Sequence, residues 1–283
     1  MELSYYPGCT LKGSARELDD SFRGVAQRLD IGLKELKDWT CCGASSAHLM
    51  DEYLETALPA ADLMIAQDAG LDVVAPCAAC HVRMKAAAQR LTRDGDLKGQ
   101  FPFTGAIRIL SGLEMLVQEG PFRLIKERVT KPLTGLRVAP YYGCLAVRPP
   151  EVVEPDNVEN PMQMDRILEA LGAEVVSWPY KTDCCGGSLS LTRTDLVLKL
   201  SRKLIDMAML VEADVMVTFC PMCQANLDTR QADISEQTGR AYAMPVLYLT
   251  ELMGLAFGHS DVGSWLRKHL VPAEQTLRSR GLL

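Results

Sequence analysis

The stretch DCCGGS (residues 183–188) places two adjacent cysteines, Cys184 and Cys185, directly before two glycines. An earlier stretch, TCCGAS (40–45), nearly repeats this arrangement, with Cys41 and Cys42 before a single glycine. A glycine after each pair lets the backbone approach a neighbour closely or adopt a positive φ. One chain that uses this unusual arrangement twice indicates an internal repeat.

The other cysteines confirm the repeat. In each half a single cysteine comes first, the adjacent pair follows, and a CxxC motif begins after 34 further residues. Between the single cysteine and the pair lie 31 residues in the first half and 39 in the second. The ten cysteines therefore form two sets of five, with none left over: Cys9, Cys41, Cys42, Cys77 and Cys80, then Cys144, Cys184, Cys185, Cys220 and Cys223.

Composition limits what these thiols can do. A chain of 283 residues, 48% hydrophobic with a net charge of −6, is long enough for two domains, and its acidic excess argues against a nucleic-acid partner. The N-terminus lacks the basic and apolar regions of a secretory signal, so we expect a cytoplasmic protein. The longest apolar stretch, 243–258, is too short to span a membrane and contains Glu251. In a reducing compartment, cysteine patterns indicate metal binding or catalysis rather than disulfides.

Both halves are predicted to alternate strands and helices. For the first half we expect strands over 2–8, 33–39 and 71–77 and helices over 15–29, 51–69 and 79–92. Ser14 and Glu17 fit a capping box that opens the first helix, and Pro59 is expected to kink the second. For the second half we expect strands over 136–144, 173–178 and 213–220 and helices over 161–171 and 196–211.

This alternation predicts an α/β fold of two tandem, repeat-related domains, each with a parallel sheet flanked by helices. The stretch TKPLTGL (130–136) marks the join, which gives domains 1–132 and 133–283. Ligands of such sheets gather beyond the carboxyl ends of the strands, where every cysteine motif falls. We therefore expect each half to collect its five thiols at one edge of its sheet, where any metal cluster they bind would lie.

Several roles for the thiols compete. Ten buried packing cysteines would not explain the repeated spacing. A structural zinc needs only four ligands, and adjacent cysteines rarely both bind one small ion. A thioredoxin-like CxxC leaves three cysteines per half unexplained. CAACH (77–81) matches a c-type haem attachment sequence, but the second half has Gln224 where His81 stands. Thiolate is the natural ligand of iron–sulfur iron, so the spacing favours two sulfur-rich metal sites.

The cysteine spacing resembles the duplicated cysteine-rich CCG domain, and most closely the catalytic B subunit of heterodisulfide reductase. The resemblance runs from Tyr5 to beyond Cys223. It is highly specific for the domain and less so for the reaction. CCG domains also occur in subunits of succinate:quinone and thiol:fumarate reductases and of glycerol-phosphate, glycolate and lactate oxidation systems.

The resemblance implies two non-cubane [4Fe-4S] clusters, each on one set of five cysteines, as the cofactors of the chain. It implies that a disulfide substrate enters between them and is reduced. It also implies two partners, a ferredoxin-like C subunit with cubane [4Fe-4S] clusters and a flavin-containing A subunit. No GxGxxG motif opens a helix in this chain, which is consistent with electron entry through a partner.

A second function stays open, that of a non-catalytic electron-transfer subunit in a quinone-linked or other respiratory oxidoreductase. Polar residues near the motifs are weaker candidates. His48 and His81 could deliver a proton to a product thiolate, although a structural role is the simpler expectation for both. Arg83, Arg148 and Lys181 could bind an anionic substrate, with solvated surface charge as the alternative.

Overall fold

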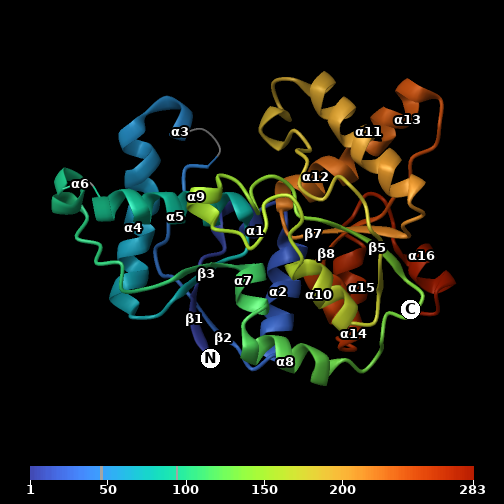
Figure 1. Cartoon of the computed structure of the whole chain (residues 1–283), viewed down its shortest axis with the longest axis horizontal. Helices are drawn as coiled ribbons and strands as arrows, with labels where there is room; N and C mark the ends of the chain where they lie inside the picture. The colour runs from blue at the N-terminus through green and yellow to red at the C-terminus, as the bar shows by residue number, and fades with distance from the viewer. Residues whose placement is uncertain (45–46, 94) are drawn as a thin grey trace.

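Two parallel sheets of four strands form the centre of the molecule. The computed structural model describes residues 1–44, 47–93 and 95–283, apart from the side chains at 48, 96 and 98. The sheets lie side by side, with the first sheet on the left of Figure 1 and the second on the right. Their strand orders, β2-β1-β3-β4 and β6-β5-β7-β8, are the same order repeated. The predicted α/β class and parallel sheets are confirmed.

The first sheet consists of β1 (Glu2–Tyr5), β2 (Gly32–Glu35), β3 (Val73–Ala75) and β4 (Ile109–Ser111). The second consists of β5 (Arg137–Tyr141), β6 (Glu174–Val175), β7 (Val215–Thr218) and β8 (Val246–Tyr248). Every pairing within the two sheets is parallel. The sequence did not predict β4 and β8, because a strand of three residues is too short to show a strand period.

Helices flank both sheets. Those of the first half are α1 (Gly8–Lys12), α2 (Arg16–Arg28), α3 (Ala47–Met50), α4 (Glu52–Ala69), α5 (Ala78–Arg93), α6 (Gly95–Gln100), α7 (Gly112–Leu116) and α8 (Glu119–Arg128). Those of the second half are α9 (Pro150–Val153), α10 (Gln163–Ala170), the 3₁₀ turn η1 (Gly187–Leu189), α11 (Thr194–Leu210), α12 (Pro221–Thr229), α13 (Gln231–Thr238), α14 (Leu249–Ala256), α15 (Val262–Leu266) and α16 (Glu274–Ser279). The predicted domain boundary at 132/133 falls between α8 and β5 and stays a prediction.

The ends of the predicted helices differ in how well the sequence marked them. Asp51 caps α4 as its side chain accepts the backbone N–H groups of Tyr53 and Leu54. The capping box predicted from Ser14 and Glu17 is wrong, because α2 begins one residue later, after Ala15, with no side-chain cap. The chain leaves α1 through a tight turn in which the Ala15 N–H binds the Thr10 carbonyl, and Glu17 turns into the interior.

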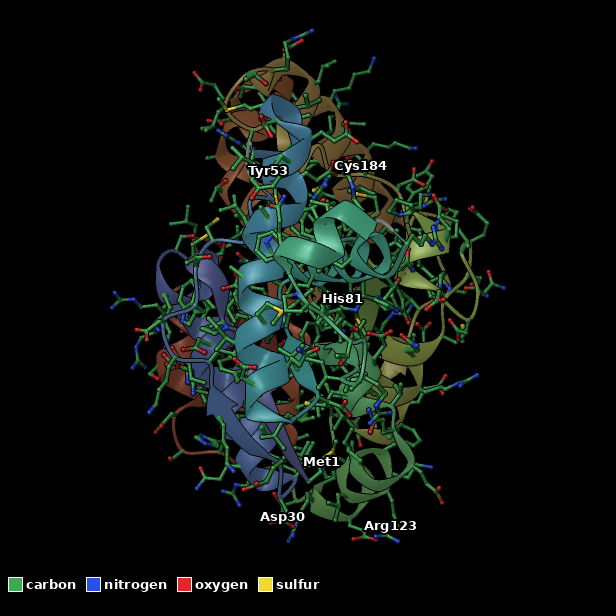
Figure 2. The ribbon with its side chains drawn as sticks, turned by 90° about the vertical axis from the view of Figure 1, so that its left-hand side faces the viewer. Met1, Asp30, Tyr53, His81, Arg123 and Cys184 are labelled. Atoms are coloured by element: carbon green, nitrogen blue, oxygen red, sulfur yellow. The ribbon has the colours of Figure 1, made fainter. Side chains whose placement is uncertain are left out.

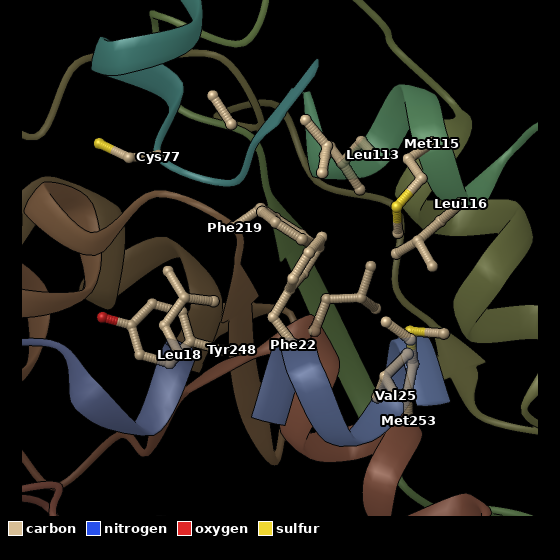
Figure 3. Packing of buried hydrophobic residues seen from close by; sticks show 14 of the residues in the cluster. Leu18, Phe22, Val25, Cys77, Leu113, Met115, Leu116, Phe219, Tyr248 and Met253 are labelled. Carbon is tan, nitrogen blue, oxygen red and sulfur yellow. The ribbon is translucent and has the colours of Figure 1, made fainter. Parts of the chain in front are cut away.

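One hydrophobic core joins the two halves. It contains side chains from both sheets and from α2, α7 and α14. Phe22 of α2 meets Phe219, the residue after β7, edge to face at 6.1 Å between ring centroids (Figure 3). Gly112 lies against the same ring, since a Cβ there would overlap Phe219. The halves therefore pack against each other through buried aromatic contacts. Among the described residues, no helix combines the length and apolar character needed to cross a bilayer.

Candidate metal centres

The first cysteine set gathers at the carboxyl ends of β1, β2 and β3. Cys9 lies in α1, Cys41 and Cys42 lie in the loop after β2, and Cys77 and Cys80 flank the start of α5. The Sγ atoms of Cys42 and Cys80 are 3.3 Å apart. Cys77 lies within hydrogen-bonding reach of Cys80, and Cys41 within reach of Cys9. The expectation that the first half collects its thiols at one sheet edge therefore agrees with these contacts.

The second set repeats the layout at the ends of β5, β6 and β7. Cys144 follows β5, Cys184 and Cys185 lie before η1, and Cys220 and Cys223 flank the start of α12. The Sγ–Sγ distance is 3.6 Å between Cys185 and Cys223 and 3.9 Å between Cys144 and Cys184. The contact of Cys185 with Cys223 matches that of Cys42 with Cys80 in the first half. The sequence repeat is thus also a repeat of thiol contacts.

The glycines beside the cysteines have a steric reason. Gly43 and Gly186, which follow the adjacent pairs, have φ values of +75° and +82°, in the left-handed region that favours glycine. Gly8 and Gly143, which precede the first cysteine of each set, face the last cysteine of that set. A Cβ at Gly8 would lie 3.0 Å from the Cys80 Sγ, and one at Gly143 2.9 Å from the Cys223 Sγ.

A tyrosine fixes the loop of each adjacent pair. The Tyr6 hydroxyl donates to the Thr40 carbonyl at 2.6 Å, and the Tyr141 hydroxyl donates to the Asp183 carbonyl at 2.6 Å. Each carbonyl belongs to the residue directly before the adjacent cysteines. This contact was not predicted from the sequence, although a signal exists, since each tyrosine stands three residues before the first cysteine of its set.

The thiols differ in acidity within each set. Contact with Cys80 lowers the pKa of Cys42 to about 7 against the opposing effect of burial. Contact with Cys144 likewise lowers the pKa of Cys184 to about 6. The pKa values of the partner thiols, Cys80 and Cys144, are raised instead, by the same contacts and by burial. Each set therefore contains thiols that readily supply the thiolate form in which cysteine binds metal.

The donor set fits iron–sulfur chemistry. Each half offers five thiols, a number and a donor type that suit iron–sulfur iron better than a four-coordinate zinc. The sulfur atoms are arranged as pairs, and within the described ranges no three His, Cys, Asp or Glu side chains converge on a point suited to a single ion. The residues that would hold a cluster are the ten cysteines.

A cavity of about 250 Å³ lies between the two halves. All five cysteines of the second set line it. The first half contributes Ala44, which is two residues after Cys42, Ala79, which lies between Cys77 and Cys80, and Val82 and Arg83 of α5. The remaining lining is mostly apolar, with Leu145 and Met222. The cavity thus brings residues next to the first cysteine set into one chamber with the second.

Of the five polar candidates, four have a described side chain, and among these four only Arg83 lines this cavity; its guanidinium also pairs with Glu55. The expectation that Lys181 is a solvated surface charge is wrong. It is buried and its Nζ lies 2.6 Å from Asp165 Oδ1. Arg148 pairs with Glu159 at 2.8 Å at the surface. The side chain of His48 lies outside the described residues.

His81 is buried, and its Nε2 lies 3.0 Å from Glu114 Oε2. Seen from the side of α4, it lies in the middle of the molecule below Cys184 (Figure 2). It does not line the cavity of about 250 Å³, but together with Glu114 it lines a smaller one, of about 40 Å³, whose walls also come from both halves and include Cys220. The structural role expected for His81 agrees with this pairing.

Comparison with known proteins places these features in context. The model of a cysteine-rich domain, CCG, matches residues 3–85 and again residues 138–228. A relative in Wolinella succinogenes, the 8-methylmenaquinol:fumarate reductase membrane anchor subunit, is 33% identical over 91% of this chain and 92% of its own. The B subunit of the ferredoxin:CoB-CoM heterodisulfide reductase of Methanosarcina mazei is 29% identical over 92% of this chain and 90% of its own.

A protein of Archaeoglobus profundus, named for its likeness to the B subunit of heterodisulfide reductase, is 25% identical over 89% of each chain. Among solved structures, a hypothetical protein from Helicobacter pylori superposes with a TM-score of 0.73 at 11% identity. That match covers 96% of this chain and 52% of the other, and it supports the fold alone.

Proposed function

The chain belongs to the family of cysteine-rich CCG domain proteins and carries the domain twice, and we propose that it is the iron–sulfur subunit in which a disulfide-type substrate is reduced. Each set of five cysteines holds one non-cubane [4Fe-4S] cluster in this proposal. Such a cluster, when bound, supplies one-electron chemistry and iron that can bind sulfur. Reduction of a disulfide takes two electrons, which two such sites facing one substrate can provide.

The cavity between the halves is the observation that carries this proposal. Its lining joins the second cysteine set to residues beside Cys42, Cys77 and Cys80, so a disulfide inside it would contact the second set and lie next to the first. Its mostly apolar walls, including Val82 and Leu145, favour the hydrocarbon part of a substrate. The relatives named as B subunits of heterodisulfide reductases support the same reaction class.

The proposal includes partners, because the chain has no nucleotide motif for its own electron entry. These are a ferredoxin-like C subunit with cubane [4Fe-4S] clusters and a flavin-containing A subunit, in the cytoplasm. The exposed thiols Cys9, Cys41 and Cys184 mark where each centre lies nearest the protein surface. Electrons from a partner have their shortest path there.

A second function is favoured by one similarity. The relative in Wolinella succinogenes, at 33% identity, is named as a subunit of a menaquinol:fumarate reductase. In this alternative the chain passes electrons between a quinone and another redox subunit, and its cavity has no disulfide substrate.

Metal content and oxidant choice test these proposals together. Protein purified without oxygen should contain about eight iron and eight acid-labile sulfide per chain. After reduction, 2-hydroxyethyl disulfide or oxidised glutathione should reoxidise it faster than menadione does. Two zinc with little sulfide would overturn the iron–sulfur assignment, whereas reoxidation by menadione alone would support the electron-transfer alternative.

A cavity variant sharpens this test. Val82→Phe fills part of the cavity and should slow reoxidation by disulfides about tenfold, which corresponds to roughly 1.4 kcal/mol in the barrier. Iron and sulfide contents should not change. The matched control is Val152→Phe on α9, whose side chain does not line this cavity. Equal rates in both variants would contradict a substrate site between the halves.

A further inference from the structure

A row of three buried polar side chains begins at Gln224, directly after the second CxxC motif, and runs into the core. Gln224 directly follows Cys223 on α12, and its Nε2 lies 2.8 Å from His269 Nδ1. The His269 Nε2 lies 2.9 Å from both carboxylate oxygens of Glu251, on α14. All three side chains are buried, Glu251 completely. A buried carboxylate and imidazole are costly to place in a core, so their presence calls for an explanation.

The first half contains a shorter version of the same arrangement. There His81, which directly follows Cys80, lies 3.0 Å from Glu114 without an intervening amide. Both carboxylates occupy the same place in the repeat, since each accepts the N–H of the residue that ends the fourth strand. Ser111 donates to Glu114 at 2.6 Å and Tyr248 to Glu251 at 2.8 Å. Each half thus places an imidazole paired with a carboxylate behind its CxxC helix.

Acidic groups surround His269 on several elements. Glu251 faces it from α14, Asp228 from α12 and Glu17 from α2. Asp228 is also bound by the backbone N–H groups of residues 270 and 271. On the chain beside it, Lys268 pairs with Asp20 at 3.0 Å. Burial acts to lower the pKa of His269, but the nearby Glu251, Asp228 and Glu17 raise it above its ordinary value.

This acidic environment is electrostatically connected to both cysteine sets through Tyr248. Its ring centroid is 6.0 Å from that of His269. Its hydroxyl is fully buried and has no hydrogen-bond partner in the part of the chain that the structure describes. Burial, Glu17 and Glu251 raise the pKa of Tyr248, and charge on Cys220 and Cys77 raises it further. Negative charge on Cys220 or Cys77 therefore acts on the Tyr248 hydroxyl, next to His269.

The amide of Gln224 links the proton on His269 to the CxxC helix. A neutral His269 accepts a hydrogen bond at Nδ1 from the Gln224 Nε2, which also donates to the Val246 carbonyl at 3.3 Å. A protonated His269 donates from both ring nitrogens. Gln224 must then turn its Oε1 toward Nδ1 and give up the bond to Val246. The side chain next to Cys223 thus has a different orientation in each protonation state.

We propose that His269 takes up a proton when the redox centre held by the second cysteine set is reduced. This inference rests on the iron–sulfur function proposed above. One electron from the partner's donor enters the centre, and one proton from solvent binds the His269 Nδ1, so imidazole becomes imidazolium. Glu251 stabilises the cation, and the added positive charge offsets the added negative charge. Both changes reverse when the electron leaves toward substrate. His269 is a positioning residue in this scheme, because it acts through Gln224.

The sign of the pH dependence follows from the acidic surroundings. Because the pKa of His269 is already raised above 6.5 before reduction, the imidazole is charged in both redox states at lower pH. The midpoint potential of the second centre should therefore be nearly flat there. Above the pKa of the oxidised protein, it should fall by up to about 59 mV per pH unit, the slope for one proton per electron.

The test is a redox titration of anaerobically purified protein from pH 6 to 9.5, followed by electron paramagnetic resonance. His269→Gln should abolish the slope, and the control His259→Gln, a histidine that contacts the Asp261 N–H instead, should retain it. Redox-difference infrared spectra of histidine-labelled protein should show imidazole bands that His269→Gln removes. A flat wild-type potential, or a slope that persists in His269→Gln, would overturn the proposal.

Two variants keep the proposal testable if His269→Gln fails to fold. Gln224→Met removes the acceptor for the protonated Nδ1. The pH at which the midpoint potential begins to fall, the onset of the slope, should therefore move lower. Gln224→Glu supplies a carboxylate and should move the onset to higher pH. An onset that stays fixed in both variants would contradict the link through Gln224. Absence of iron and sulfide would instead refute the proposed function itself, which keeps the two failures distinguishable.

Discussion

Adjacent thiols in this protein face different partners. In each pair the first cysteine is exposed and the second is buried. Cys185 contacts Cys223 of the CxxC motif, whereas Cys184 contacts Cys144, the first cysteine of the set. Neighbouring side chains in a non-helical segment can point to opposite sides of the backbone. One adjacent pair therefore connects both ends of a five-thiol set, which a single cysteine could not do.

Replacing one member of a pair tests this division. Cys185→Ser exchanges a soft thiolate for a less acidic alcohol, which iron–sulfur iron binds poorly. We expect the second centre to be lost or altered and disulfide reduction to fall sharply, while the first centre keeps its signal. Cys42→Ser should give the converse result. Electron paramagnetic resonance of the reduced protein counts the centres, and two intact centres in Cys185→Ser would rule out ligation by five thiols.

At the scale of elements, the strand-to-helix turns decide where the cysteines lie. Each CxxC motif begins two residues after a strand, β3 or β7, and ends in the first turn of a helix, α5 or α12. Each fourth strand, β4 or β8, leads into a helix whose glutamate accepts the strand-end N–H. These fourth strands escaped prediction, yet they hold Glu114 and Glu251 behind the CxxC helices. Short elements thus contribute more to the sites than their length suggests.

The start of α4 offers a test at this scale. Asp51 accepts two backbone N–H groups at 2.7 and 2.9 Å. Asp51→Ala should lower the free energy of unfolding by about 1 kcal/mol, because these donors lose their partner. Asp51→Asn keeps an acceptor oxygen and should cost less. Anaerobic denaturant titration measures both, and an equal loss in the two variants would indicate that charge rather than capping stabilises this end.

Across the molecule, one hydrophobic core holds the two halves together and so sets the distance between the two cysteine sets. Phe219 directly precedes Cys220, and its ring packs on Phe22 and over Gly112 of the first half. The cavity between the halves has walls from both. A shift of one half against the other would therefore change the distance between the proposed centres as well as the shape of the cavity.

A double-mutant cycle tests this contact. Phe219→Ala should cost about 3–5 kcal/mol through the cavity it leaves. Gly112→Ala should also destabilise, because its Cβ would overlap the Phe219 ring. The double variant should cost less than the sum, since removal of the ring relieves the clash. Gly120→Ala on α8, which has nothing within 4 Å, is the control and should be nearly neutral. Additive losses in a denaturant titration would show that the two sites do not interact.

The sequence alone was enough to predict the internal repeat, the two sets of five cysteines, the parallel sheets and the position of each motif after a strand. These features follow from spacing and from periodic apolar residues, which are local in the chain. The helix over 51–69 was predicted for the same reason, whereas its cap at Asp51 was not predicted, although both partners of that side chain lie within three residues.

The folded structure was needed to show which thiol of each pair is buried, that Lys181 pairs with Asp165 in the interior, and that one cavity is lined by the second cysteine set and by residues next to the first. It also brought His269 to Gln224, a residue 45 positions earlier in the chain. Such contacts depend on how helices and loops pack across the two sheets. Packing joins residues that are far apart in sequence, and no local pattern specifies which side chains will meet there.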